Sequence, residues 1–385
     1  MAGIYIHIPF CKQACNYCNF YFSTSLEHKN ELIEALLQEI EHRKDYLESK
    51  QIDTIYFGGG TPSLLSSDEL EKIFDKIVST FDVHPLAEIT LEANPDDLHK
   101  EKLKAFKQSP INRFSIGIQS FMDDDLQYMN RAHTSIEAIE SIYRTQDAGF
   151  ENISIDLIYG TPTLSNSNWN NNILKAINTQ VPHISAYALT VEQHTKLDTL
   201  IRKKILAPVD EVKSSEQFIH MIELLETNAF EQYEISNFCK NEQISKHNSS
   251  YWKGIPYIGI GPSAHSFDGR SRSWNPSSNM KYVQGIRTKM DVRTTEVLTR
   301  HDVLNEQIMT GIRTKWGINL MMIENTYGKE VIEEMQYNLQ ENAQQSWYRI
   351  ENNVLTLTKE GKLFADKIAS DLFFDSSEEG ELFSL

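Results

Sequence analysis

Three of the four cysteines lie close together near the start of the chain, at Cys11, Cys15 and Cys18. They follow an apolar run rich in β-branched residues, residues 4–8, which predicts a buried strand that ends at Pro9. The thiols therefore belong to the loop after the first strand. In an α/β sheet this is the place where the ligand crevice opens.

The spacing C-x3-C-x2-C narrows the chemistry of these thiols. A zinc site usually needs four ligands, commonly in paired C-x2-C hooks, and the sequence has no second hook. A disulfide framework would leave one of the three thiols unpaired. Three thiolates can hold three irons of a 4Fe-4S cube and leave the fourth iron open to an exchangeable molecule. Three ordinary core cysteines remain the weaker alternative, because the thiols bunch on a loop.

The residues around the cysteines resemble a known family. C-x3-C-x-Tyr-C, in which Tyr17 precedes Cys18, looks like the signature of the radical S-adenosylmethionine (SAM) family. The longer string that runs from Tyr5 through His7-Ile-Pro-Phe to Cys11 is similar to the anaerobic coproporphyrinogen III oxidase family and to its haem chaperone branch, HemW. The resemblance continues to Trp252 and, more weakly, to the C-terminus. It implies that Cys11, Cys15 and Cys18 hold a 4Fe-4S cluster.

Composition limits the classes of function. The chain has 385 residues, of which 40% are hydrophobic and 24% charged, which suits one large and one small globular domain. Its net charge of −17 argues against a nucleic-acid-binding surface. No apolar run is long enough to span a bilayer, and the N-terminus lacks the basic stretch of a signal peptide. The few, clustered cysteines favour a reducing compartment, so we expect a cytoplasmic location.

Strand and helix patterns alternate six times up to residue 189. Strands are expected at residues 4–8, 52–57, 87–92, 113–118, 152–159 and 183–189, and helices at residues 31–50, 66–81, 98–108, 168–178 and, in two stretches, 123–149. This alternation predicts a parallel sheet of right-handed βαβ units. Six units instead of eight favour a partial, open barrel, and the resemblance implies the same (β/α)6 core. We therefore expect an α/β fold, a partial (β/α)6 TIM-like barrel of the radical SAM type.

The second half of the sequence has a different character. We expect a helix at residues 212–228, loops to about residue 276 and a short helix at residues 281–286. Helices at 302–313 and 323–340, a hairpin at 347–357 turning at Asn352-Asn353, and a helix capped by Thr358 predict a small C-terminal α+β, winged-helix-like domain. Its acidic character favours a lid or docking role. The expected domains are 1–208 (core), 209–295 (helical and loop extension), 296–375 (C-terminal domain) and 376–385 (acidic tail, expected to be disordered).

Polar residues and glycines stand where the predicted strands end. Gly58-Gly59-Gly60 ends the second strand, and bare backbone there lets a ligand approach closely. Because the site of such a barrel collects at the carboxyl ends of the strands, we expect these positions to face the cysteine loop. The resemblance implies that SAM is bound by Tyr5, Tyr17, Gly59, Gly60, Thr61, Glu92, Gln119, Arg131 and Asp156. Reductive cleavage of SAM would also require an electron donor.

A second motif, His247-Asn248-Ser-Ser-Tyr251-Trp252, is expected on a polar loop. Imidazole is a common haem ligand and flat aromatic rings suit a porphyrin face. Residue chemistry alone favours a hydrogen-bonded loop packed on the barrel rim. The resemblance reverses that preference, because H-N-x-x-Y-W marks the haem chaperone branch. His247, Asn248, Tyr251 and Trp252 are therefore candidate haem-binding residues.

Two functions are compared on this basis. One is a haem chaperone that binds haem and transfers it to acceptor proteins, respiratory-chain proteins among them. The other is an oxygen-independent coproporphyrinogen III oxidase, which oxidatively decarboxylates two propionates. The oxidase branch has a further cysteine where Phe20 stands, and an N-terminal extension where only four residues precede Tyr5. Together with H-N-x-x-Y-W, these features favour the chaperone. A homodimer is compatible with the sequence but not required by it.

Overall fold

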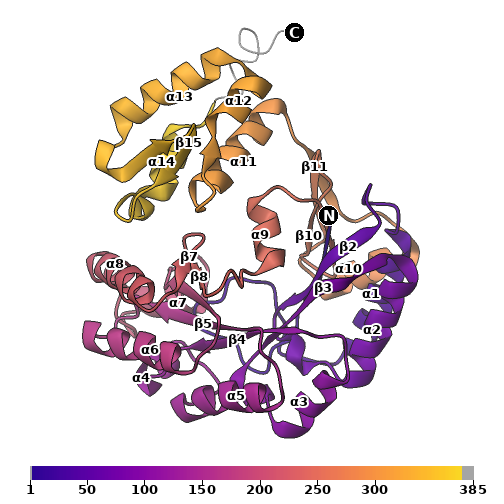
Figure 1. Ribbon diagram of the computed structural model, residues 1–385. Helices are drawn as coiled ribbons and strands as arrows, with labels where there is room; N and C mark the ends of the chain where they lie inside the picture. Colours follow the sequence, from indigo (N-terminus) through magenta and orange to yellow (C-terminus); the bar gives the residue numbers. More distant parts are fainter. Residues whose placement is uncertain (1, 375–385) are drawn as a thin grey trace.

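The computed structural model describes residues 2–374, and a large sheet forms the body of the molecule (Figure 1). Its strands are β1 (Gly3–Ile8), β2 (Gln51–Gly59), β3 (Asp82–Ala93), β4 (Arg113–Gln119), β5 (Ile153–Tyr159), β6 (His183–Ala188), β7 (Glu231–Gln232), β8 (Asn237–Cys239), β9 (Tyr257–Ile260), β10 (His265–Phe267), β11 (Ser271–Trp274) and β12 (Thr294–Val297). Their order in the sheet is β12-β11-β10-β9-β1-β2-β3-β4-β5-β6-β8-β7. Strands β1 to β6 pair with one another in parallel, β9 joins β1 in parallel, and β8 pairs with β6 in the antiparallel sense. The edge strands β12 and β7 do not pair with each other, so the predicted open, partial barrel is confirmed.

Helices cover the outer face of this sheet (Figure 1). Those that alternate with β1 to β6 are α1 (Lys29–His42), α2 (Ser67–Thr80), α3 (Lys100–Lys107), α4 (Asp123–Tyr128), α5 (Ser135–Asp147) and α6 (Asn166–Asn178). Local sequence fixes where several of them begin. Ser66 and Glu69 form a reciprocal capping box at α2, and Thr134 and Glu137 form another at α5. These two caps hold the register of the helices that pack behind β3 and β4.

One face of the six parallel strands is apolar, and the other face is polar. In β1, Ile4, Ile6 and Ile8 belong to the main hydrophobic cluster, so the side chains between them point to the inner face. The alternation continues through β6, and the inner positions of β2 to β6 include Thr54, Tyr56, Glu88, Thr90, Glu92, Arg113, Ser115, Gln119, Asp156, Ser185 and Tyr187. The interior of a closed α/β barrel is usually filled by branched aliphatic residues. A polar inner face is instead suited to receive a ligand.

The expectation of loops between residues 229 and 276 is wrong. This segment contains the short strands β7 to β11 and the helix α9 (Lys246–Trp252). Strands of two to four residues are too short to show periodicity in the sequence. Their pairing partners are also remote: Gly3 of β1 lies opposite Tyr257 of β9. The segment is therefore ordered by contacts that span most of the chain.

Two predicted helices have different bounds in the structure. The first was expected to reach residue 50, but α1 ends at His42, and the next residue, Arg43, donates from Nη1 to the carbonyl oxygen of Gly259 at 2.8 Å. The helix predicted at residues 323–340 is divided by Gly328. Its φ of 106° and ψ of 166° belong to a region that only glycine adopts freely. The chain therefore turns where the sequence has a single glycine.

The C-terminal residues form an α+β unit around their own hydrophobic cluster, as predicted. Its elements are α11 (Arg300–Ile312), β13 (Ile318–Asn319), α12 (Leu320–Tyr327), α13 (Lys329–Asn342), β14 (Tyr348–Glu351), β15 (Val354–Leu357) and α14 (Ala365–Asp371). The predicted hairpin turns at Asn352 and Asn353, which both have positive φ. Thr358 accepts a hydrogen bond from the backbone of Gly361 at 3.2 Å, and a 3-10 turn precedes the shortened last helix. The predicted acidic tail lies outside the described residues.

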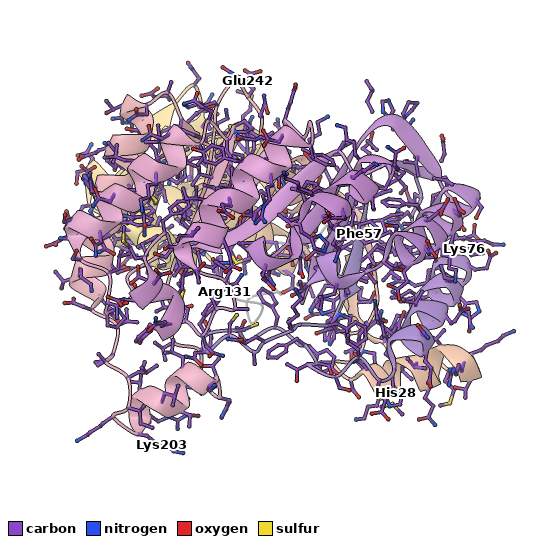
Figure 2. All side chains as sticks on the ribbon, turned by 90° about the horizontal axis from the view of Figure 1, so that it is seen from below. His28, Phe57, Lys76, Arg131, Lys203 and Glu242 are labelled. Carbon is purple, nitrogen blue, oxygen red and sulfur yellow. The ribbon has the colours of Figure 1, made fainter. Side chains whose placement is uncertain are left out.

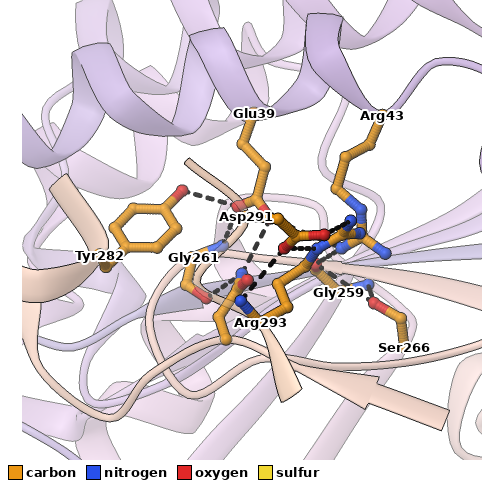
Figure 3. Close-up of polar contacts among 9 residues, drawn as sticks. Glu39, Arg43, Gly259, Gly261, Ser266, Tyr282, Asp291 and Arg293 are labelled. Atoms are coloured by element: carbon orange, nitrogen blue, oxygen red, sulfur yellow. Dashed lines mark hydrogen bonds and ion pairs between the residues drawn. The ribbon is translucent and has the colours of Figure 1, made fainter. Parts of the chain in front are cut away.

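The segments between core and C-terminal unit add α7 (Lys196–Arg202), α8 (Glu211–Thr227) and α10 (Asn279–Thr288). Helix α7, just before Lys203, projects from the body (Figure 2). The buried carboxylate of Glu39, on α1, holds the segment around β9 and α10 against that helix. It accepts from the Gly261 backbone at 2.8 Å and from the Tyr282 hydroxyl at 2.6 Å (Figure 3). Among residues 2–374, no helix has the length and apolar character needed to cross a membrane.

Candidate functional site

The cysteine loop follows β1 and is closed at its base. The backbone of Cys11 donates to the carbonyl of Ser23 at 3.0 Å, and the backbone of Ser23 donates to the carbonyl of Pro9 at 2.6 Å. Asn16, which is buried within the loop, donates from its amide to the carbonyl of Tyr128 at 2.7 Å. The loop is thus held on both sides by backbone groups.

One cavity of about 440 Å³ lies between this loop and the inner face of the sheet. Cys11, Cys15 and Cys18 are free thiols of intermediate exposure, and all three line it. No group of three or more cysteine, histidine or acidic side chains within residues 2–374 stands at metal-binding geometry. The structure therefore brings the thiols to one cavity without gathering them around a common point.

The glycine turn after β2 closes against this cavity. Gly59 has a φ of 104°, and a Cβ there would lie 2.4 Å from the ring of His7. At Gly60 a Cβ would lie 2.7 Å from the backbone oxygen of Phe10. Larger residues would push the turn away from the cysteine loop. The triplet therefore lets the end of β2 pass directly beside that loop.

Two carboxylates face the cavity from the inner side of the sheet. Glu92 accepts from the Tyr56 hydroxyl at 2.7 Å and from the Gly59 backbone at 3.2 Å. Desolvation, only partly offset by these bonds, raises the pKa of Glu92 to about 7. Desolvation likewise raises the pKa of Asp156 to about 6, although Ser115 donates to it at 3.2 Å. A cationic ligand bound between Glu92 and Asp156 would lower the free-energy cost of ionising both carboxyl groups.

Arg131 supplies the positive charge of the cavity, and Figure 2 shows it in the middle of the molecule beside side-chain sulfur. It donates from Nη1 to the sulfur of Cys15 at 3.3 Å and from Nη2 to Asn94 Oδ1 at 2.6 Å. A third bond runs to the carbonyl of Gly117 at 2.9 Å. The Nε of Arg131 has no hydrogen-bond partner in the described part of the chain, although it is buried. This side chain links the cysteine loop to β3 and β4.

Eight of the nine residues predicted to bind SAM line this cavity, namely Tyr17, Gly59, Gly60, Thr61, Glu92, Gln119, Arg131 and Asp156. Tyr5 does not. Its hydroxyl is 3.1 Å from Nδ1 of His7, and its ring stacks on Tyr56. Further lining residues that the sequence analysis did not name are Tyr56, Asn94, Ser115, Ser185, Tyr187 and Glu192. Most occupy inner positions of the strands, so the period-two alternation was the signal that would have identified them.

The H-N-x-x-Y-W motif forms the helix α9 and not the predicted loop. The helix lies on the concave side of the sheet, between the sheet and the C-terminal unit (Figure 1). Buried Glu88 on β3 accepts from the backbone of Lys246 at 3.0 Å and from that of His247 at 2.9 Å. A carboxylate at this position also offsets the partial positive charge of the first helical turn. The start of the helix is therefore fixed to the inner face of the sheet.

His247 is buried beneath the motif, with 1% of its surface exposed. Its Nδ1 lies 2.8 Å from Thr54 Oγ1 and its Nε2 lies 2.8 Å from the Tyr251 hydroxyl. Its ring stacks on Tyr56, the residue that donates to Glu92. Desolvation and the positive charge of Arg113 lower the pKa of His247 to about 3, so the ring is neutral. Both ring nitrogens are engaged within the protein.

The other three residues of the motif line a second cavity of about 670 Å³. Asn248, Tyr251 and Trp252 form one wall, and residues of the C-terminal unit form the opposite wall. Tyr187, Ala188 and Asn248 line both cavities. The two spaces therefore meet at the end of β6 and the side of α9.

Comparison with known proteins agrees with this architecture. The model of the radical SAM superfamily matches residues 5–173, and that of the HemN C-terminal domain matches residues 298–364. A solved structure of coproporphyrinogen III oxidase (HemN) from Escherichia coli superposes with a TM-score of 0.83 over 97% of this chain and 90% of its own. At 20% identity, that likeness concerns the fold alone.

Curated relatives are closer in sequence. The heme chaperone HemW of Bacillus subtilis is 34% identical over 372 residues, which cover 96% of this chain and 98% of the relative. HemW of Lactococcus lactis is 33% identical over 349 residues, which cover 89% of this chain and 91% of the relative. The closed cysteine loop and the motif helix thus stand in a chain that aligns with these relatives from end to end. The chain belongs to the HemW family, built on a radical SAM core.

Proposed function

We propose that this protein is a haem chaperone, which binds haem and transfers it to acceptor proteins. The observation that carries the proposal is the second cavity, which is lined by Asn248, Tyr251 and Trp252 of the motif and is separate from the cysteine loop. Its volume of about 670 Å³ is within the roughly 300–1,000 Å³ usual for cofactor-sized ligands. Its position beside α9 gives a bound haem a site of its own. The curated relatives, which are named heme chaperones, support the same function.

A 4Fe-4S cluster and SAM belong to the proposal as resident cofactors of the first cavity. The donor set there fits thiolate ligation, because Cys11, Cys15 and Cys18 line one cavity and Arg131 donates to one of the thiols. The buried Nε of Arg131, unpartnered in residues 2–374, is a further polar atom that a ligand would satisfy. When bound, such a cluster supplies single electrons to SAM, which calls for an external electron donor.

The remaining residues of the first cavity bind and orient. SAM carries a sulfonium, an ammonium and a carboxylate. Glu92 and Asp156 offer negative charge to its cationic groups, while Arg131 offers positive charge to its carboxylate. The backbone beside Gly59 and Gly60 leaves room for the ligand to approach. In this proposal, Tyr5 supports Tyr56 from behind and does not itself contact the ligand.

His247 has a supporting role in this proposal. Its hydrogen bond with Thr54 holds α9 against β2, and its hydrogen bond with Tyr251 fixes that side chain within α9, where Asn248, Tyr251 and Trp252 line the second cavity. Coordination of haem iron by His247 would require one of these bonds to break. The neutral state of its buried ring is compatible with either role. The haem spectrum of a His247 variant distinguishes the two roles, as described in the Discussion.

An anaerobic assay tests the function. The reconstituted protein is titrated with haemin, and in parallel it is given coproporphyrinogen III, SAM and a reductant. A chaperone binds haem stoichiometrically, passes it to an apo-acceptor protein such as a haem-free cytochrome, and forms no protoporphyrinogen. Decarboxylation of coproporphyrinogen at many turnovers, without stable haem binding, would replace the proposal with the oxidase.

A further inference from the structure

We propose that the second cavity holds haem by its two carboxylates, with Arg313 and Lys362 of the C-terminal unit as their partners. This rests on the haem chaperone function proposed above and assigns the residues that would recognise the ligand. Both cations line the cavity on the side opposite α9. Arg313 follows α11, whereas Lys362 lies in the turn before α14, so two separate elements bring the positive charges together.

Neither cation is committed to a strong partner. Arg313 pairs with Asp366, whose side chain is 91% exposed, and it donates from Nη1 to the carbonyl of Met309. Lys362 donates to the neutral Gln232 Oε1 at 2.7 Å. Burial lowers the pKa of Lys362, which means that its charge is incompletely compensated. A carboxylate from a ligand would replace an exposed partner at Arg313 and a neutral one at Lys362.

The other charged groups of the cavity do not oppose this assignment. Glu234 is buried at 3% exposure, and it already accepts hydrogen bonds from the backbone of Ser236 at 3.2 Å and from the side chain of Asn237. Burial raises its pKa and so favours the neutral form. Asp366 is the remaining acid of the lining, and it faces solvent. A ligand carboxylate would therefore displace Asp366 from Arg313, whereas at Lys362 it would replace the neutral amide of Gln232.

The rest of the lining suits a flat apolar body. Tyr251 and Trp252 come from α9, Phe218 comes from α8, and Leu363 stands beside Lys362. Leu363 is 38% exposed and adds apolar surface to the lining of the cavity. An apolar slot with two cations along one edge matches a tetrapyrrole that carries two propionates. It does not match a neutral apolar ligand.

The test compares haem with its dimethyl ester, which keeps the ring and the iron but lacks both carboxylate charges. Full-length protein and the double variant Arg313→Ala/Lys362→Ala are titrated with each ligand under anaerobic conditions. Charge-assisted hydrogen bonds predict a loss of roughly tenfold to a hundredfold in haem affinity for the double variant. The ester should bind both proteins equally. Lys329→Ala, which removes an exposed cation of α13 outside the cavity, is the matched control and should bind haem normally.

The outcomes separate this inference from the proposed function. If the unaltered protein binds no haem, the chaperone function fails. If it binds haem and the double variant binds it equally well, the assignment of Arg313 and Lys362 is overturned. If the double variant fails to fold, the two affinities of the unaltered protein still test the inference. Equal affinity for haem and for its dimethyl ester contradicts the inference, and weaker binding of the ester supports it. Iron content of the cluster should be the same in every variant.

Discussion

The two cavities meet at the end of β6, but they are built in different ways. The first is enclosed by the inner face of one sheet and by a loop tied down through buried hydrogen bonds, such as that of Asn16 to the Tyr128 carbonyl. The second lies between two hydrophobic clusters, one in the core and one in the C-terminal unit. Half-exposed ion pairs outside the cavity lining, Lys315 with Glu231 and Lys359 with Glu226, join residues on either side of the boundary between these two units. Buried hydrogen bonds therefore hold the walls of the first cavity, whereas half-exposed ion pairs, which each contribute little free energy, hold the two units that flank the second.

This difference matters for a protein proposed to receive and release a ligand. A cofactor that stays needs a site in which every polar group is already positioned. A ligand that must be released can leave more easily when the contacts between the two sides of its site each contribute little free energy. The comparison therefore predicts that substitutions in the first cavity leave the second largely intact. Five measurements test it, from the largest expected effect to the smallest.

Cys15→Ala should abolish the cluster. The substitution removes one of three thiols of the first cavity, and two thiolates no longer match a cube that needs three protein ligands. Iron and sulfide content, with the visible absorbance of the reconstituted protein, measure the loss. Haem affinity should stay within about twofold, because Cys15 does not line the second cavity. Parallel loss of haem binding would show that the cavities are not independent.

Glu92→Gln should weaken SAM binding about tenfold or more and yet stabilise the ligand-free protein at alkaline pH. The pKa of Glu92 is raised from 4.5 to about 7, so the folded chain favours the protonated carboxyl. Its stabilising contribution is fully present below pH 4.5 and is lost as the pH rises from 4.5 through about 7, above which the cost of ionisation stays constant. Glutamine removes this cost. We expect the free energy of unfolding to rise by about 1–2 kcal/mol at pH 8 and to change little at pH 5. Denaturant titrations at both pH values measure it, and an equal change at the two would contradict the assigned cause.

The same shift predicts the pH dependence of SAM binding by the unaltered protein. The affinity for the cationic ligand should fall as the pH decreases through about 7, where Glu92 takes up a proton, and again near 6 for Asp156. Glu92→Gln should lose the upper of these two steps.

His247→Ala should destabilise the protein by about 2–4 kcal/mol, because it leaves the buried Thr54 hydroxyl without its partner and opens a space beneath α9. Haem affinity should fall several-fold through displacement of Tyr251. The position of the Soret band should be retained, since the neutral ring already bonds through both nitrogens. A shifted Soret band at full haem occupancy would instead identify His247 as an iron ligand.

Ionic strength should have the smallest effect on ligand binding, and it should distinguish the two cavities in the unaltered protein. Arg313 is partly exposed, with 17% of its side chain accessible, so added salt should weaken haem binding by about twofold to threefold between 0.05 and 0.5 M. SAM binding between Glu92, Asp156 and Arg131 should change less, because those charges are removed from bulk water. Equal salt dependence of haem binding and of SAM binding would contradict this distinction between the two cavities.

Much of this architecture was predictable from the chain. The alternation of strands and helices up to residue 189 predicted the open barrel, because the residue pattern within a long periodic segment indicates whether it is a strand or a helix. The glycine triplet and the polar strand ends predicted most of the first cavity. Tyr5 was assigned to SAM from the family motif. It does not line that cavity, and its ring stacks on Tyr56, its neighbour on the adjacent strand, so the assignment stays a prediction. Residues 229–276 were not predictable as strands, since two to four residues carry too little pattern.

By itself, the sequence determined the parallel core and the family. Those features depend on spacing within short stretches, which a linear pattern records. Only the tertiary structure decided that the H-N-x-x-Y-W motif is a helix with His247 turned inward, and that Arg313 and Lys362 face it. Residues this far apart meet because strands and helices from both hydrophobic clusters converge there. No local periodicity encodes that convergence, because it follows from how the whole chain buries its apolar surface.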